Sequence, residues 1–310
     1  MCELIISYDK TYVMKNGIYA LFLSMLVIGC AEKRQKTTTA TMSTSEFITV
    51  TNEKTVSQLA DTLIPQLREK GFKIMANIDH SLAAKKAGLE LRPTRTVIFG
   101  NPKGGTLLMQ QDQRIGLDLP LKLLIWEDEA GDTQVSYYNR TTLTSRYDIS
   151  EPQAVIEKVN GVLAGFTGNE TIEGASVASI NDQIITKKSP HTADETFSKL
   201  QEVVNSKGLH VMAVIPHDQG AANVDLELRP TRVLIFGNPK VGTLLMQSNQ
   251  SIGIDLPLKV LVHEDENGDV FVSYFDASFL TARHGITDKA AVVEKVNGAL
   301  DGITSAVIAQ

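Results

Sequence analysis

Two histidines in equivalent places of a repeated sequence are the residues best suited to acid–base chemistry. His80 and His217 each follow a strand-like stretch and precede a short helix-like stretch. An imidazole can act near neutral pH as a general base, a general acid or a metal ligand. Beside a guanidinium that clamps an anion, Arg95 or Arg232, either ring could be the proton-transfer group of an enzyme. Either ring could also cap a helix or bond a backbone carbonyl, and we favour that structural role because no cysteine or second histidine adjoins it in the sequence.

A glycine-containing segment, FGNPKGGT in the first copy, could cradle an anion. A phosphate-binding Walker loop needs Gly-Lys followed by Ser or Thr, and neither copy has that order. Gly104 is replaced by Val241 in the second copy, so no close approach of a ligand to the backbone is required there. Asn101 and Asn238 have the position of helix N-caps, each followed by a proline suited to the first helical turn. We expect the capping role, with free amide ends that remain able to hold an anion.

Other charged and aromatic positions leave further alternatives open. Two histidines of the second copy, His263 and His284, could form a metal or haem site with His217. Asp118 and Asp255 precede Leu-Pro and are expected to stabilise a turn. A recurring set of cations could line an anion pocket together with the histidine and asparagine, or could form an ordinary solvated surface. These cations are Arg92, Arg95, Lys103 and Lys122, repeated as Arg229, Arg232, Lys240 and Lys259.

The order of residues indicates that a whole domain is duplicated in tandem. A shift of 137 residues aligns the halves, and 27 of 37 positions are identical between Glu90–Trp126 and Glu227–His263. This period is that of a domain and not of a solenoid repeat. We assign residues 46–166 to the first repeat, 167–181 to a linker rich in Gly, Ser, Thr and acidic residues, and 182–310 to the second repeat. We expect each copy to bury its own apolar interior, and the repeats could pair as an intramolecular pseudo-dimer.

Local patterns predict β-α-β, a short helical segment, three or four more strands and a C-terminal helix in each repeat. Capping boxes at Thr55 and Thr192 start the first helix, and Gly71 and Gly208 end it. Alternating and continuous apolar runs predict strands, and an acidic turn joins the last two into a hairpin. Strands with helices on one face give an α+β fold. The predicted strands of the first repeat cover residues 46–50, 73–78, 96–100, 123–126 and 133–139, and its last helix begins at Ser150.

Each copy resembles the domain of unknown function 302 (DUF302). The resemblance rests on IDHSLAAKKAGLEL at 78–91, VIFGNPKGGTLLMQ at 97–110, IGLDLPLKLLIWEDEAGD at 115–132 and VSYY at 135–138, with their equivalents in the second copy. It covers nearly the entire chain after the N-terminal 45 residues. The resemblance implies two tandem TBP-like β-α-β(4)-α domains, each a largely antiparallel sheet with helices packed on one face. It implies no assigned activity, so no catalytic residue is carried over from it.

Residues 1–30 have the pattern of a lipoprotein signal peptide. After Met14, which we take as the natural start, a basic residue precedes an apolar run shorter than the roughly 20 residues that span a bilayer. The sequence VIGC, ending at Cys30, resembles a bacterial lipobox, so Cys30 is the expected lipidation site; an uncleaved signal anchor is the alternative. By resemblance to the Gram-negative sorting rule, Ala31 favours the outer membrane, facing the periplasm. Residues 31–45 are predicted to be a flexible tether.

Composition argues against several classes of protein. The net charge is -6 and no basic stripe is present, which argues against a nucleic-acid partner. The two cysteines, Cys2 and Cys30, lie in the leader, so no disulfide, thiolate metal site or cysteine nucleophile is expected in the folded part. We rank first a non-enzymatic module, without cofactor or metal, that binds a small anionic or apolar ligand or a protein in the cell envelope. An enzyme of unknown reaction that uses His80 or His217 is the alternative.

Overall fold

The computed structural model describes residues 46–138, 140–147, 149–150, 157, 161, 165 and 183–309. The leader with Cys30, the tether at 31–45, the linker at 167–181 and nearly all of the predicted last helix of the first repeat lie outside these residues. All the described elements belong to one compact unit, residues 38–310. This unit has its own buried core, so we expect it to fold without the residues that precede it.

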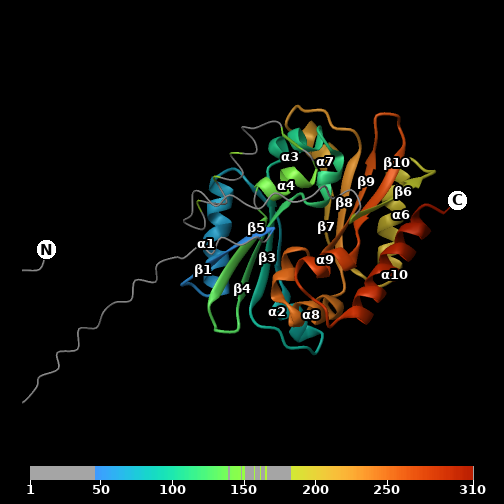
Figure 1. The fold of residues 1–310 in the computed structure, drawn as a ribbon. Helices are drawn as coiled ribbons and strands as arrows, with labels where there is room; N and C mark the ends of the chain where they lie inside the picture. The colour runs from blue at the N-terminus through green and yellow to red at the C-terminus, as the bar shows by residue number, and fades with distance from the viewer. Residues whose placement is uncertain are drawn as a thin grey trace, which may run out of the picture. The chain divides into compact units, whose positions relative to one another are not determined.

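The first repeat follows the predicted order of strands and helices, and its five predicted strands are confirmed (Figure 1). The strands are β1 (Phe47–Asn52), β2 (Lys73–Asp79), β3 (Thr94–Gly100), β4 (Leu121–Glu127) and β5 (Thr133–Tyr138). The helices are α1 (Val56–Glu69), α2 (His80–Lys86), α3 (Pro102–Met109), the 3-10 helix η1 (Gln113–Leu117) and α4 (Arg140–Arg146). Helix α4 was not predicted from the sequence.

The second repeat has the same order and ends in a long helix. Its strands are β6 (Ile184–Ser189), β7 (His210–Pro216), β8 (Thr231–Gly237), β9 (Leu258–Glu264) and β10 (Val270–Phe275). Its helices are α6 (Ala193–Ser206), α7 (His217–Ala222), α8 (Pro239–Ser248), the 3-10 helix η3 (Gln250–Ile254), α9 (Ala277–Arg283) and α10 (Ala290–Val307).

Side-chain caps explain where the long first helix of each repeat begins. Thr55 and Gln58 form the predicted capping box at the start of α1, and Thr192 and Glu195 form the second at α6. Each box satisfies two amide groups that the first turn leaves unpaired. At the other end, Gly71 has a φ of 83°, in the left-handed region that a non-glycine residue rarely adopts.

Each repeat forms one five-stranded antiparallel sheet. The strand orders are β1-β5-β4-β3-β2 and β6-β10-β9-β8-β7, and every neighbouring pair of strands is antiparallel. Helix α1 packs on β2, β3 and β4, and α6 packs on β7, β8 and β9, so the predicted α+β arrangement is confirmed. In Figure 1, α1 lies at one side of the unit and α6 and α10 lie at the other.

The opposite face of each sheet is covered by the other repeat. Helix η3 packs on β3 and β4, and η1 packs on β8 and β9. One continuous apolar cluster therefore includes Leu124 and Ile125 of the first repeat together with Val233 and Leu261 of the second. The expectation that each copy buries its own interior is wrong in this respect, because the apolar sheet face that a helix leaves uncovered is buried against the other copy.

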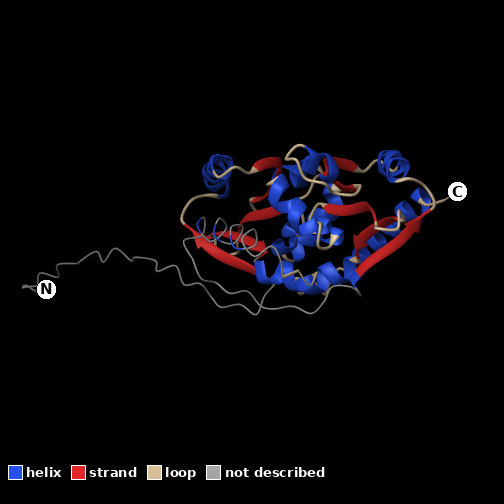
Figure 2. Cartoon of the chain, turned by 90° about the horizontal axis from the view of Figure 1, so that it is seen from above, coloured by secondary structure: helices blue, strands red, loops and turns tan. Residues whose placement is uncertain are grey.

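The short helices meet at the junction between the repeats. Helix α3 packs beside α7, and α2 packs beside α8. Figure 1 shows these two pairs at opposite ends of the junction, and Figure 2 shows short helices gathered between the outer helices. The β2–α2 and β7–α7 corners, where His80 and His217 lie, are thus brought against the other copy.

Candidate functional site

Two pockets lie where the repeats meet, and each is lined by residues of both. The first pocket has a volume of about 290 Å³ and joins the β3–α3 turn of the first repeat to α7 of the second. The second has a volume of about 180 Å³ and joins the β8–α8 turn to α2, with α10 along one side. Met75 lines the first pocket and its equivalent, Met212, lines the second. The two sites are therefore related by the duplication.

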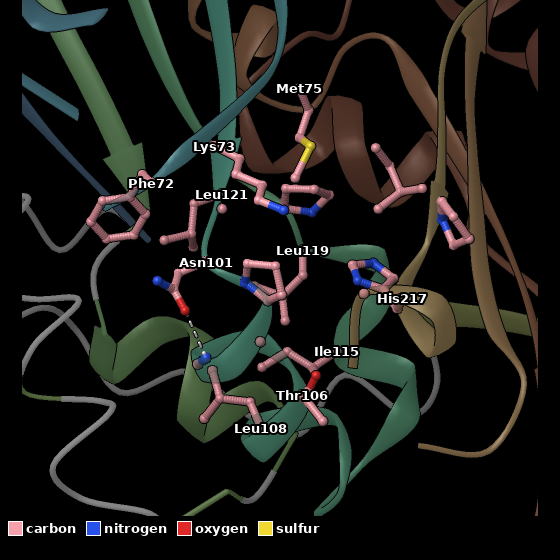
Figure 3. A pocket seen from close by; sticks show the side chains of 18 of the residues that line it. Phe72, Lys73, Met75, Asn101, Thr106, Leu108, Ile115, Leu119, Leu121 and His217 are labelled. Carbon is pink, nitrogen blue, oxygen red and sulfur yellow. Dashed lines mark hydrogen bonds between the residues drawn. The ribbon is translucent and has the colours of Figure 1, made fainter. Parts of the chain in front are cut away.

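The candidate histidines and asparagines meet in pairs that the sequence did not predict. His217 of the second repeat and Asn101 of the first line the first pocket (Figure 3). His80 of the first repeat and Asn238 of the second line the second pocket. Each histidine begins a short helix that packs beside a helix of the other copy. Four of the six candidate ligand-binding residues are thus brought together, one from each repeat in each pocket.

His80 is held by a hydrogen-bond chain through the sheet. Its Nε2 lies 3.0 Å from Thr96 Oγ1, and the Thr96 hydroxyl donates to the carbonyl of Gly253 in the other repeat, also at 3.0 Å. The side chain is buried, with 7% of its surface exposed. Burial, and then the charge of Lys122, lower the pKa of His80 to about 4. The ring is therefore neutral at pH 7.

His217 occupies the equivalent position but lacks the equivalent hydrogen-bond partner. Val233 stands where the first repeat has Thr96, and within the described residues Nε2 of His217 is buried without a hydrogen-bond partner. Burial, and then the charge of Lys259, lower the pKa of His217 to about 3, so this ring is also neutral at pH 7. The exchange of threonine for valine is visible in the alignment of the two copies, but only the structure shows that it lies beneath the histidine.

Asn101 and Asn238 are helix N-caps, as predicted. The Asn101 side chain accepts from the amide of Gly104 at 3.2 Å and donates to the carbonyl of Gly71 at 3.1 Å. Asn238 accepts from the amide of Lys240 at 3.0 Å. These bonds fix the turn that forms one wall of each pocket.

Arg95 and Arg232 pair with aspartates that adjoin the candidate histidines in the sequence. Arg95 forms an ion pair with Asp79 at 3.0 Å. Arg232 pairs with Asp218 at 3.0 Å and also with Asp194. Neither guanidinium lines either of the two pockets. The structure therefore does not bring the expected anion clamp into either pocket.

Two lysines predicted to line an anion pocket or to be solvated instead join the repeats. Lys122 donates to the carbonyl of Leu256 at 3.1 Å, and Lys259 donates to that of Leu119 at 3.0 Å. Both side chains are buried. Burial lowers the pKa of Lys122 to about 8. Because Leu119 and Leu256 line the pockets, each lysine also fixes a wall of a pocket in the other copy.

Asp255 belongs to a buried ionic cluster that the sequence did not predict. Its carboxylate accepts from the Tyr138 hydroxyl at 2.8 Å and from Arg283 at 3.1 Å, and it lies 2.7 Å from Nε2 of His284. Burial raises the pKa of Asp255, but the charge of Arg283 and the His284 contact outweigh burial and lower it well below its usual range. Tyr138 comes from the first repeat, so the cluster crosses the junction. The role of Asp255 is thus not confined to its own turn.

The equivalent Asp118 holds the other half of this cluster. It accepts from Arg146 at 3.1 Å and from the Tyr147 hydroxyl at 2.9 Å. Glu46 pairs with Arg146 and, at 2.9 Å, with Arg283 of the other repeat. A buried charge costs several kcal/mol unless it is paired, so this network fixes the pairing of the repeats.

The hypothesis of a metal or haem site formed by three histidines is not supported. His263 stacks on Phe271 with ring centroids 5.6 Å apart, and His284 pairs with Asp255, while His217 lines the first pocket. Among the described residues, no group of three or more His, Cys, Asp or Glu could hold a metal ion.

One family model matches both repeats of the chain. The model of the family described as "Domain of unknown function DUF302" matches residues 48–166 and 185–303, which confirms the predicted tandem arrangement. A solved structure, "uncharacterized conserved protein DUF302 from Bacillus stearothermophilus", is 19% identical with a TM-score of 0.37, covering 40% of this chain and 97% of that chain.

Curated relatives match one part of the chain. Proteins named "Fluoride-specific ion channel FluC 1" from Brucella suis biovar 1 (strain 1330) and Brucella abortus biovar 1 (strain 9-941) are each 38% identical over 125 residues, 39% of this chain. The matches cover 49% and 46% of those proteins, so the chain spans about half the length of the curated relatives it matches. Within the part of the chain that the structure describes, no helix is long and apolar enough to cross a membrane.

Proposed function

The chain belongs to the DUF302 family, whose domain it carries twice, and on that premise we propose that it is a ligand-binding module and not an enzyme. The observation that carries this proposal is the pair of pockets at the junction, lined by both repeats. Ligand sites in proteins are typically concave and mostly apolar, with a few polar groups that orient the ligand. A neutral histidine in a wall made mostly of apolar side chains has that character.

The size and lining of the pockets favour a small apolar ligand. An apolar cavity of about 150 Å³ is large enough to bind benzene. The volumes of about 290 and 180 Å³ therefore suit one aromatic ring with short substituents, or a short alkyl chain. Apolar side chains such as Phe72, Leu121, Leu245 and Ile252 would remove such a ligand from water.

The enzymatic alternative has less support from the geometry. Among the described residues, neither pocket is lined by a carboxylate or a cysteine that could act with the histidine. Arg95 and Arg232, the expected anion clamps, are paired with aspartates and line neither pocket. General acid–base catalysis works best with a pKa near the operating pH, whereas His80 and His217 have pKa values of about 4 and 3.

We propose further that Cys30 carries a lipid that anchors the module in the bacterial envelope, with the outer membrane as the expected location. The support is the leader and its VIGC sequence. The test is to compare the chain with a Cys30→Ser variant for incorporation of labelled palmitate and for fractionation with the outer membrane. Loss of label and membrane association in the variant is expected; an unlabelled wild-type chain would contradict the anchor.

The binding proposal is tested with residues 46–310, which contain all the described elements of the compact unit without the anchor. Labelled methionine methyl groups separate the pockets, because Met75 lines the first and Met212 the second. Titration with toluene should shift both methyl signals in a saturable manner. Native mass spectrometry of the full-length protein, purified from the cell envelope, should show a retained small molecule. If toluene shifts neither signal and no molecule is retained, the proposal is wrong.

A further inference from the structure

The two pockets differ at the residue beneath each histidine. We propose that Thr96 makes His80 an obligate hydrogen-bond acceptor, so that the second pocket selects apolar molecules bearing a hydrogen-bond donor, whereas the first pocket lacks this selectivity. Alcohols, phenols and amides with an N–H group are the chemical classes that would bind the second pocket. This inference rests on the proposed binding function and assigns the ligand class of one of its sites.

The direction of the hydrogen bonds fixes the proton on His80. The hydroxyl of Thr96 has one proton, and the carbonyl of Gly253, 3.0 Å away, can only accept. The Thr96 oxygen must therefore accept from Nε2 of His80, which lies 3.0 Å from it. A neutral imidazole has a single N–H group, so Nδ1 of His80 carries a lone pair and no proton.

Nδ1 of His80, the acceptor atom of the ring, is the atom that remains available to a ligand. Within the described residues, no hydrogen bond involves Nδ1 of His80, while its ring lines the second pocket. The Thr281 hydroxyl in the same wall already donates to the carbonyl of Ala277 at 2.9 Å, and that of Thr243 donates to Pro239 at 2.7 Å. Asn238 and Lys295 also line this pocket, but both residues are exposed and their polar groups remain hydrated. A ligand group placed against His80 must therefore donate.

The first pocket has no such constraint. Val233 offers no oxygen to His217, whose Nε2 is buried without a partner among the described residues. The His217 ring can then adopt either tautomer, and Nδ1 of His217 can donate or accept a hydrogen bond. Thr106 of the first pocket is the equivalent of Thr243. Within the described part of the chain, Oγ1 of Thr106 is buried without a hydrogen-bond partner, whereas the Thr243 hydroxyl has one. The first pocket can thus take ligands that donate and ligands that only accept.

The experiment compares p-cresol, which donates, with 4-methylanisole, which only accepts, on residues 46–310. The Kd of each probe is read from the methyl signal of Met212 for the second pocket and of Met75 for the first. The affinity ratio of cresol to anisole should be about 10-fold higher at Met212 than at Met75, since a site that hydrogen-bonds its ligand rejects an analogue lacking the group. The ¹⁵N shifts of His80 should show an unprotonated Nδ1.

Exchange of the two residues supplies matched variants. Thr96→Val should reduce the ratio at Met212 to that at Met75, and Val233→Thr should raise the ratio at Met75. Thr96→Ser keeps the hydroxyl and should keep the selectivity, which guards against a failure of Thr96→Val to fold. Equal ratios at both methyl groups, or a ratio at Met212 that Thr96→Val leaves unchanged, would overturn the inference. Failure of toluene to bind either pocket, together with the absence of a retained molecule in native mass spectrometry, would instead overturn the binding function itself.

Discussion

His80 and His217 occupy equivalent places, but the hydrogen bonds around their rings differ by one hydroxyl group. Thr96 links His80 to the carbonyl of Gly253, so three buried polar groups satisfy one another. Val233 leaves Nε2 of His217 buried without a partner within the described residues. A buried polar atom without a partner costs about 1–3 kcal/mol, so the second repeat bears a cost that the first avoids.

This difference predicts opposite effects of the two exchanges on stability. Thr96→Val should lower the free energy of unfolding by about 1–3 kcal/mol, because it leaves the Gly253 carbonyl and the His80 ring without a partner. Val233→Thr should cause no loss, or a gain of about 1 kcal/mol, because it supplies a partner to His217. Urea unfolding of both variants measures the effects. A larger loss for Val233→Thr than for Thr96→Val would contradict the hydrogen-bond assignment.

The neutral state of His80 makes stability depend on pH. Burial and the charge of Lys122 lower its pKa from 6.5 to about 4. Between these pH values the unfolded chain binds a proton that the folded protein does not. The free energy of unfolding is therefore highest above pH 6.5 and decreases as the pH falls towards 4. The loss is about 1.4 kcal/mol per pH unit inside this window.

The measurement is urea unfolding at pH 7 and at pH values between 6.5 and 4. His80→Gln should show a shallower decline of the unfolding free energy than the wild-type chain, since the variant no longer has this group to titrate. His210→Gln, at an exposed position, serves as the matched control and should keep the wild-type slope. The same slope in His80→Gln and the wild type would show that His80 is not held neutral.

At the scale of elements, the 3-10 helices η1 and η3 require glycine where they press on the other repeat. A Cβ atom at Gly253 would lie 2.7 Å from Cδ1 of Leu124, and one at Gly116 would lie 3.1 Å from Cδ1 of Leu261. Both leucines are fully buried, and each would have to shift to admit the added Cβ atom. The close approach of these short helices is what lets the other copy cover each sheet.

Alanine at these glycines should therefore destabilise the protein. Gly253→Ala is expected to lower the free energy of unfolding by about 1–3 kcal/mol, as overpacking of a core does, and Gly116→Ala by less. Gly220→Ala is the control, because a Cβ there would meet Pro102 at an ordinary 3.8 Å. Thermal unfolding of the three variants gives the order. Equal stability of Gly253→Ala and Gly220→Ala would contradict the packing described for η3.

The elements themselves were predictable because local chemistry determines them. The capping boxes at Thr55 and Thr192 and the caps at Asn101 and Asn238 depend on residues within a few positions of one another. Helix α9 was missed, although Asp276 is an N-cap that accepts from the amide of Ser278. No tertiary contact is needed to form such caps, so a sequence pattern reports them directly.

The site could not be predicted in the same way, because its pairs come from different repeats. His217 and Asn101 are far apart in the sequence, and nothing in either copy shows that they line one pocket. Lys122 has the pattern of a surface cation, and its burial follows from the carbonyl that the other repeat presents to it. Asp255 likewise depends on Tyr138 across the junction. Such contacts depend on how two copies dock, which the periodicity of one copy does not contain.

At the scale of the whole described unit, the repeats hold each other through reciprocal contacts. Gln113 donates to the Thr231 hydroxyl at 2.7 Å, and its equivalent, Gln250, donates to the Thr94 hydroxyl at 2.8 Å. The lysine contacts with the Leu-Pro carbonyls are reciprocal in the same way. Each of these bonds has a counterpart in which the two repeats exchange roles, as in a dimer with twofold symmetry.

The second repeat alone should therefore not remain a folded monomer. Residues 182–310 contain both members of a reciprocal pair, Gln250 and Thr231, so two copies can restore the bonds that the first repeat supplies. We expect a homodimer whose unfolding midpoint rises with protein concentration, because only association buries the apolar face that includes Leu261. Sedimentation equilibrium and urea unfolding at several concentrations measure this. A monomer that unfolds cooperatively, at a midpoint independent of concentration, would show that the repeat has a sufficient core of its own.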